Sequence, residues 1–156
     1  MQASCGSGWC AVNNAHCCQF TLGARGAVKE NGMIKIGIVD DHAIVRSGLR
    51  QFLSEHVDLR VTGEASNGRE AIDLVRNTEV DVLIMDLSMP GQSGLDALAM
   101  LRAKAPDMGI LILSGYPEEH YAMNLIRQGA SGYLNKECEP KEIVEAIRTI
   151  ALGRRY

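Results

Sequence analysis

The 156-residue chain lacks an apolar run long enough to cross a membrane. A spanning helix needs roughly 18 or more consecutive apolar residues, and no stretch of this sequence approaches that length. Aromatic residues are few, at 4%, and no cluster of basic residues accompanies the formal net charge of −3. Proteins that bind nucleic acid concentrate positive charge against the phosphates. We therefore expect no membrane segment and no binding of nucleic acid by this chain alone.

Cysteine is scarce in most of the chain. Four of the five cysteines lie in the first 18 residues, and only Cys138 lies beyond them. A disulfide framework would distribute its cysteines through the fold, so we expect a reducing, cytoplasmic location. The first residues also lack the basic start and apolar stretch of a secretory signal.

The first 32 residues show neither strand nor helix periodicity. They are rich in glycine, alanine, serine and asparagine, a composition typical of loops or unstructured segments. A zinc site is the alternative, and its candidate ligands would be Cys5, Cys10, His16, Cys17 and Cys18. Zinc motifs usually place a second ligand pair beyond a folded loop, and none follows here. We interpret residues 1–32 as an unstructured extension, either added artificially or lying upstream of a natural start at Met33.

From Met33 onward, one unit repeats five times: a short apolar run, a turn and an amphipathic segment. The predicted strands are Met33–Val39, Leu59–Ala65, Val80–Met85, Gly109–Leu113 and Gly132–Leu134. The predicted helices are Ala43–Glu55, Gly68–Thr78, Gly94–Ala105, Glu118–Gln128 and Glu139–Leu152. Unbroken apolar strands suit a parallel sheet that is covered on both faces. The sequence predicts an α/β domain over residues 33–152, with a doubly wound, five-stranded parallel sheet and five helices.

Polar residues follow the predicted strands. In open α/β sheets, ligands bind beyond the carboxyl ends of the strands. The residues at those ends are Asp40, Asp41, Asp86, Ser114 and Lys136. If the strand order is 2-1-3-4-5, the first and third strands are neighbours and the three aspartates converge. Asp41, Ser114 and Lys136 each have a simpler explanation alone, such as Asp41 capping the following helix, whereas Asp86 precedes a loop and does not. The prediction therefore depends on the whole set.

Three neighbouring carboxylates require a counter-charge. Two unit charges about 4 Å apart repel by roughly 4 kcal/mol at an effective dielectric of 20. A hard divalent cation bound through oxygens relieves this repulsion, and Mg²⁺ typically keeps waters for a phosphate ligand. With Lys136, these groups suit transfer of a phosphoryl group to a carboxylate.

The strand-end residues lie within longer motifs that resemble the receiver domain of two-component response regulators. The motifs are IGIVDDH (Ile36–His42), DVLIMDLSMPGQSGL (Asp81–Leu95), ILILSGY (Ile110–Tyr116) and GASGYLNKE (Gly129–Glu137). The resemblance covers Met33 to about Leu152 and extends to the NarL/FixJ (LuxR-type) subfamily. It implies the CheY-like, flavodoxin-like fold, and it makes residues 153–156 the start of a linker to a helix-turn-helix domain.

The resemblance also implies a role for each site residue. Asp86 would accept a phosphoryl group from a sensor histidine kinase, and Ser114 and Lys136 would contact that group. Mg²⁺ would be bound by Asp41 directly, by Asp40 mainly through water, by Asp86, and by the backbone carbonyl of Ser88. Ser114 and Tyr133 would form the switch. The altered surface would favour a homodimer through the fourth and fifth helices, or would control a tethered DNA-binding domain.

Three other functions remain open. One is a pseudo-receiver that binds partners without phosphorylation, because fold does not determine function. Another is an aspartyl-phosphate hydrolase of the haloacid-dehalogenase kind, although such enzymes usually carry DxD after the first strand. The last is a flavodoxin-like cofactor carrier, which Asp40 and Asp41 disfavour by repelling a flavin phosphate.

One departure from the receiver pattern is Glu137, which stands where many members have a proline after the lysine.

Overall fold

The computed structural model describes residues 32–89, 94–115 and 118–156. The first cysteines and His16, considered above as zinc ligands, lie outside these residues, as does the Pro90-Gly91 turn.

Five strands alternate with five helices along the chain. The elements are β1 (Ile34–Val39), α1 (Ala43–Ser54), β2 (Leu59–Ala65), α2 (Gly68–Asn77), β3 (Val82–Met85), α3 (Gly94–Lys104), β4 (Gly109–Ser114), α4 (Glu118–Arg127), β5 (Gly132–Asn135) and α5 (Pro140–Ala151). The strands form one sheet in the order β2-β1-β3-β4-β5, and every pair is parallel. The predicted fold class and strand order are confirmed, and each predicted boundary lies within two residues of the observed one.

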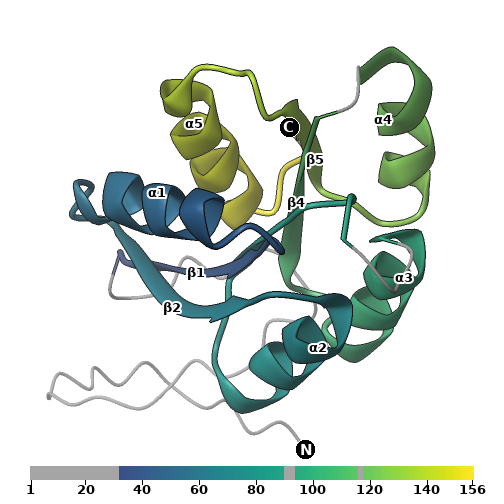
Figure 1. The fold of residues 1–156 in the computed structure, drawn as a ribbon, viewed down its shortest axis with the longest axis horizontal. Helices are drawn as coiled ribbons and strands as arrows, with labels where there is room; N and C mark the ends of the chain where they lie inside the picture. Colours follow the sequence, from purple (N-terminus) through teal and green to yellow (C-terminus); the bar gives the residue numbers. More distant parts are fainter. Residues whose placement is uncertain (1–31, 90–93, 116–117) are drawn as a thin grey trace, which may run out of the picture.

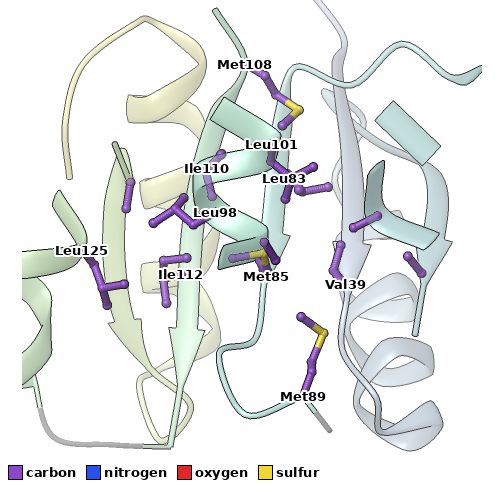
Figure 2. Packing of buried hydrophobic residues seen from close by; sticks show 14 of the residues in the cluster. Val39, Leu83, Met85, Met89, Leu98, Leu101, Met108, Ile110, Ile112 and Leu125 are labelled. Atoms are coloured by element: carbon purple, nitrogen blue, oxygen red, sulfur yellow. The ribbon is translucent and has the colours of Figure 1, made fainter. Parts of the chain in front are cut away.

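The sheet is covered on both faces (Figure 1). Helices α1 and α5 lie on one face, where Leu53 and Ile147 pack against β1 and β4 residues. Helices α2, α3 and α4 lie on the other face. Figure 2 shows that core, in which Leu98 and Leu101 of α3 pack against residues of β3 and β4. Burying each such leucine stabilises the fold by about 1.5–3 kcal/mol. The unbroken apolar strands are therefore explained by burial on both sides of the sheet.

Helix α1 begins at Ala43, as predicted, but the cap proposed for it as an alternative is not the observed one. Its N-cap is His42, whose backbone carbonyl accepts the first helical hydrogen bond, from Arg46 N–H at 3.1 Å. Asp41 lies one residue earlier, so the alternative in which it caps this helix is wrong. Helix α2, by contrast, has a side-chain cap, because Asn67 Oδ1 accepts from Glu70 N–H at 2.9 Å.

Residues after α5 return to the sheet. Gly153 adopts a left-handed φ of 75°, which ends the helix at low steric cost. Tyr156 N–H then donates to the carbonyl of Ser131 at 3.0 Å, just before β5. Of the four residues predicted to start a linker, Gly153, Arg154 and Tyr156 therefore hydrogen-bond to the domain through their backbone N–H groups.

Within the described ranges, no helix combines the length and the apolar character needed to span a membrane.

Candidate functional site

Two aspartates lie side by side where β1 and β3 end. The register pairs Val39 with Met85, so the residues that follow, Asp40 and Asp86, emerge at the same edge of the sheet. Asp86 N–H donates to the Val39 carbonyl at 2.9 Å, which continues the ladder into the site. Both carboxylates are almost completely buried, with Asp40 2% exposed and Asp86 1% exposed. Buried charges of this kind need partners.

Lys136 supplies a positive charge to both buried carboxylates. Its Nζ lies 2.8 Å from Asp40 Oδ2 and 2.7 Å from Asp86 Oδ2. The lysine follows β5, and its backbone N–H donates to the Ser114 carbonyl at the end of β4, at 2.8 Å. Ser114 itself is fully buried. The predicted convergence of Asp40, Asp86, Ser114 and Lys136 at one edge is therefore present.

The ionisation of the site follows from these contacts. Burial favours the neutral form of Asp40, but hydrogen bonds from the Lys136 ammonium and the His42 backbone outweigh it, so the pKa of Asp40 lies below its ordinary value. Burial also opposes the charge of Lys136. Its bonds to Asp40 and Asp86 outweigh that effect, so the pKa of Lys136 lies above its ordinary value. The charged lysine thus lies between the carboxyl groups of Asp40 and Asp86.

Asp41 and His42 complete one side of the cluster. His42 N–H donates to Asp40 Oδ1 at 2.8 Å, and His42 Nδ1 lies 3.1 Å from the same oxygen. The same ring nitrogen lies 2.8 Å from Asp41 Oδ1, a buried atom that takes part in no hydrogen bond with the described residues. His42 is not among the site residues predicted from the sequence, where it appears as the last residue of the motif Ile36–His42. Its adjacency to two acids was the available signal.

Arg46 also contacts the site, which sequence reasoning missed. Its guanidinium donates to the backbone carbonyl of Asp40 at 2.6 Å. The same side chain lies 3.4 Å from Glu64 of β2, which holds it beside the end of β1. Arg46 lies one helical turn after His42, which follows the acidic pair. This spacing is the sequence signal that could have indicated a role for Arg46 at the site.

The loop after β3 holds Asp86 from the other side. Ser88 N–H donates to Asp86 Oδ1 at 3.0 Å. Gly94 begins α3 directly against this loop, because a Cβ there would lie 2.9 Å from the backbone of Leu87. The close approach requires glycine at this position. The Ser88 carbonyl remains a predicted cation ligand.

Tyr133, predicted to form the switch with Ser114, is only 6% exposed. It belongs to the core cluster of β4 and α4 residues such as Ile112 and Leu125. Its role in a switch stays a prediction.

The joint after Lys136 forms without the proline that many receivers carry. Glu137 N–H donates to Asn135 Oδ1 at 2.9 Å, and Cys138 N–H donates to the Asn135 carbonyl at 3.0 Å. All described peptide bonds are trans. Asn135 thus closes the turn by accepting an N–H that proline does not have.

The acids and His42 fit a divalent cation. Asp40, Asp41, His42 and Asp86 each offer one ligand atom, and these four atoms lie within 4.8 Å of one another. In octahedral coordination with bonds of about 2.1 Å, ligand atoms lie roughly 3.0–4.2 Å apart. The buried Asp41 Oδ1, which accepts no hydrogen bond from the described residues, suits a cation ligand.

Comparison with known proteins identifies the family. Residues 36–148 match the family model of the response regulator receiver domain, which is most of the described chain. The chain belongs to the response regulator receiver domain family. Its fold is therefore that of a receiver domain of two-component response regulators.

Curated relatives extend beyond this receiver domain. Response regulator UvrY of Escherichia coli (strain K12) is 40% identical over 124 residues, which are 80% of this chain and 57% of UvrY. Oxygen regulatory protein NreC of Staphylococcus carnosus (strain TM300) is 43% identical over 124 residues, which are 79% of this chain and 57% of NreC. The chain thus spans little more than half the length of these relatives.

Solved structures share the receiver architecture. A LuxR-family two-component response regulator from Aurantimonas sp. SI85-9A1 is 37% identical, with a TM-score of 0.75 over 79% of this chain and 88% of that one. The receiver domain of the putative response regulator NarL from Mycobacterium tuberculosis is 32% identical, with a TM-score of 0.73 over 78% of this chain and 98% of that one. The subfamily resemblance noted from the sequence is confirmed.

Proposed function

We propose that this receiver domain takes a phosphoryl group onto Asp86 from a sensor histidine kinase and thereby switches a surface that controls transcription. The observation that carries the proposal is the arrangement around the Asp86 carboxylate. One oxygen accepts from Ser88 N–H and the other from the Lys136 ammonium. A buried carboxylate oriented from both sides can act as a nucleophile without a general base.

The transfer balances as an in-line displacement. A carboxylate oxygen of Asp86 attacks phosphorus, and the P–N bond to the donor imidazole breaks. The electron pair of that bond stays on the donor nitrogen, which takes up a proton from solvent. Lys136 neutralises charge on the transferred group, and Ser114, at the end of the neighbouring strand, would hydrogen-bond one of its oxygens. The domain itself would catalyse only its own phosphorylation and dephosphorylation.

A magnesium ion fits the acidic side of the site. Asp41, Asp40, Asp86 and the backbone carbonyl of Ser88 would hold it. Bound there, Mg²⁺ would supply positive charge beside the incoming phosphoryl oxygens. Without a cation, Lys136 is the charged side chain that contacts both the Asp40 and the Asp86 carboxylates among the described residues.

Phosphorylation would change the site by local electrostatics. The new group adds about two negative charges and three acceptor oxygens. Lys136, now shared by Asp40 and Asp86, would turn to the phosphoryl group, and the backbone bond from Lys136 to Ser114 joins the two loops that would move. Because Tyr133 is already buried, we place its role in stabilising the switched state.

The partners follow from this mechanism. The kinase would be the phosphoryl donor, and the face of α4 and α5 would form a homodimer. DNA contact would come only through a helix-turn-helix domain following the receiver, as in LuxR-type regulators. The scarcity of cysteine beyond residue 18 supports a cytoplasmic location.

The deciding experiment is labelling with a small phosphodonor. With acetyl phosphate or phosphoramidate and Mg²⁺, we expect stoichiometric labelling of the native chain and none of Asp86→Asn, measured by intact-protein mass spectrometry. The matched control is Asp73→Asn, a change of the same kind on the exposed surface of α2, which should label normally. Full labelling of Asp86→Asn would exclude Asp86 as the acceptor. A native chain that cannot be labelled would indicate a pseudo-receiver, and turnover of added phosphate esters would indicate a hydrolase.

A further inference from the structure

We infer that His42 is an additional ligand of the cation site and shifts its preference from Mg²⁺ toward divalent cations that accept nitrogen, such as Mn²⁺. This inference rests on the proposed function, because it concerns the cation that would serve phosphorylation of Asp86. It goes beyond an all-oxygen magnesium site, to which the imidazole would contribute nothing.

The position of the imidazole nitrogen supports a ligand role. His42 Nδ1 lies 3.1 Å from Asp40 Oδ1 and 2.8 Å from Asp41 Oδ1. These separations are close to the roughly 3.0 Å expected between adjacent ligands of one ion with bonds of about 2.1 Å. The ring thus faces the acids with one nitrogen, although 62% of the side chain is exposed.

The local backbone holds the ring in this place. His42 is the N-cap of α1, with extended φ and ψ of −87° and 108°, and its side chain makes no capping hydrogen bond to the helix. Its own N–H is bound to Asp40 Oδ1 at 2.8 Å. The backbone is therefore tied to one acid while the ring nitrogen lies between that acid and the next.

A second observation points to a ligand at the same place. Asp41 Oδ1 is buried, and its 2.8 Å contact with His42 Nδ1 lacks the geometry of a hydrogen bond, so no residue that the structure describes donates to it. Such an acceptor is costly unless something positive satisfies it. A cation shared by Asp41 Oδ1 and His42 Nδ1 would satisfy both atoms.

The ligand atoms of the site predict which cations His42 would bind more tightly. Oxygen-only sites suit Mg²⁺, whereas imidazole nitrogen favours first-row transition metals, with affinity rising from Mn²⁺ toward Cu²⁺. An imidazole added to carboxylates should therefore strengthen Mn²⁺ binding more than Mg²⁺ binding. Losing even a residue that only orients a metal ligand typically costs about 10–100-fold in metal affinity, so the loss of a ligand itself should be measurable.

The test compares His42→Asn with the matched control His56→Asn in the full chain. His56 lies after α1 and contacts the Phe52 carbonyl at 3.2 Å, away from the acids. Mg²⁺ and Mn²⁺ affinities are measured by calorimetry, and ¹⁴N modulation of bound Mn²⁺ by pulsed electron paramagnetic resonance. We expect histidine nitrogen modulation in the native chain and in His56→Asn, and its loss in His42→Asn. The preference for Mn²⁺ over Mg²⁺ should fall about 10-fold in His42→Asn alone.

The outcomes separate this inference from the proposed function. Nitrogen modulation that is absent from the native chain, or that persists in His42→Asn or in Asp41→Asn, overturns the role of His42. An equal loss of Mg²⁺ and Mn²⁺ affinity in His42→Asn overturns the selectivity. Labelling of Asp86 in the native chain with Mg²⁺ is measured in parallel. If it succeeds while the nitrogen signal fails, the receiver function stands without this ligand, and if both fail, both proposals are wrong.

Discussion

Lys136 is the residue on which the charge balance of the site depends. It bonds to Asp40 and to Asp86, and its own side chain is only 25% exposed. Removing one partner of a buried charged pair leaves the other charge without compensation, which costs more than the pair itself contributes. The cost should fall on stability as well as on phosphorylation.

We expect Lys136→Met to lower the free energy of unfolding by about 1–3 kcal/mol at pH 7 without divalent cations. The measurement is urea denaturation followed by circular dichroism. Lys141→Met, which removes an exposed lysine at the start of α5, should stay within about 0.5 kcal/mol of the native chain. A Lys136→Met variant as stable as the native chain would contradict the counter-charge role.

The same residue predicts a pH dependence. Because the pKa of Asp40 lies below its ordinary value of 3.8, its ionised form contributes stability above that pH, and the contribution is lost as pH falls through the lowered pKa. Lys136 contributes this stability through its hydrogen bond. The stability gap between Lys136→Met and the native chain should therefore be largest near neutral pH and should narrow below about pH 4. If the difference in stability between Lys136→Met and the native chain grows at acidic pH, the predicted direction of the pH dependence is wrong.

At the scale of elements, the ends of strands and helices determine the shape of the site. The parallel register of β1 with β3, and of β4 with β5, brings residues far apart in sequence to one edge. Helix α3 begins directly after the loop that holds Asp86, and its first residue contacts Leu87 of that loop. The placement of α3 should therefore be sensitive to a single added methyl group.

Two glycine-to-alanine changes test this packing. In Gly94→Ala the new Cβ would lie 2.9 Å from backbone atoms of Leu87, so we expect a loss of about 1–3 kcal/mol. Gly48 lies on exposed α1 with no atom within 4 Å of an added Cβ, so Gly48→Ala should stabilise the helix by about 0.5–1 kcal/mol. Thermal denaturation of both variants is the measurement. Equal effects would show that the approach of α3 to Leu87 does not matter.

At the scale of the whole molecule, the proposed switch must carry a change from the acids to the α4 and α5 face. A backbone hydrogen bond joins Lys136 to Ser114 at the ends of β5 and β4, and Tyr133 of β5 belongs to the core beneath α4. Two-state elements of this kind respond to a ligand that binds one state better. Beryllofluoride, a phosphoryl mimic, provides such a ligand.

We expect beryllofluoride with Mg²⁺ to shift the amide resonances of Ser88, Ser114 and Lys136 and to raise the sedimentation coefficient to that of a dimer. Asp86→Asn should show neither change. Shifts without a change in sedimentation would retain the switch and refute the homodimer. Identical spectra before and after addition would refute the switch.

Much of this receiver domain could be predicted from its sequence. Unbroken apolar runs such as Val82–Met85 require burial on both faces, which in a chain of alternating strands and helices means a parallel sheet. Once the strand order was predicted, Asp40 and Asp86 had to meet, because parallel strands end at the same edge. The chemistry of the site was thus predicted from the identity of the acids, and the fold was predicted from the repeated strand and helix unit.

Only the tertiary structure determined which side chains contact one another in the site. Sequence could not show that Lys136 joins Asp40 to Asp86, that His42 rather than Asp41 caps α1, or that Tyr133 is already buried. Backbone patterns follow from local preference and burial, which adjacent residues encode. Contacts between side chains depend on distances of a few ångströms between residues as far apart as Asp40 and Lys136, and only the packed chain determines those distances.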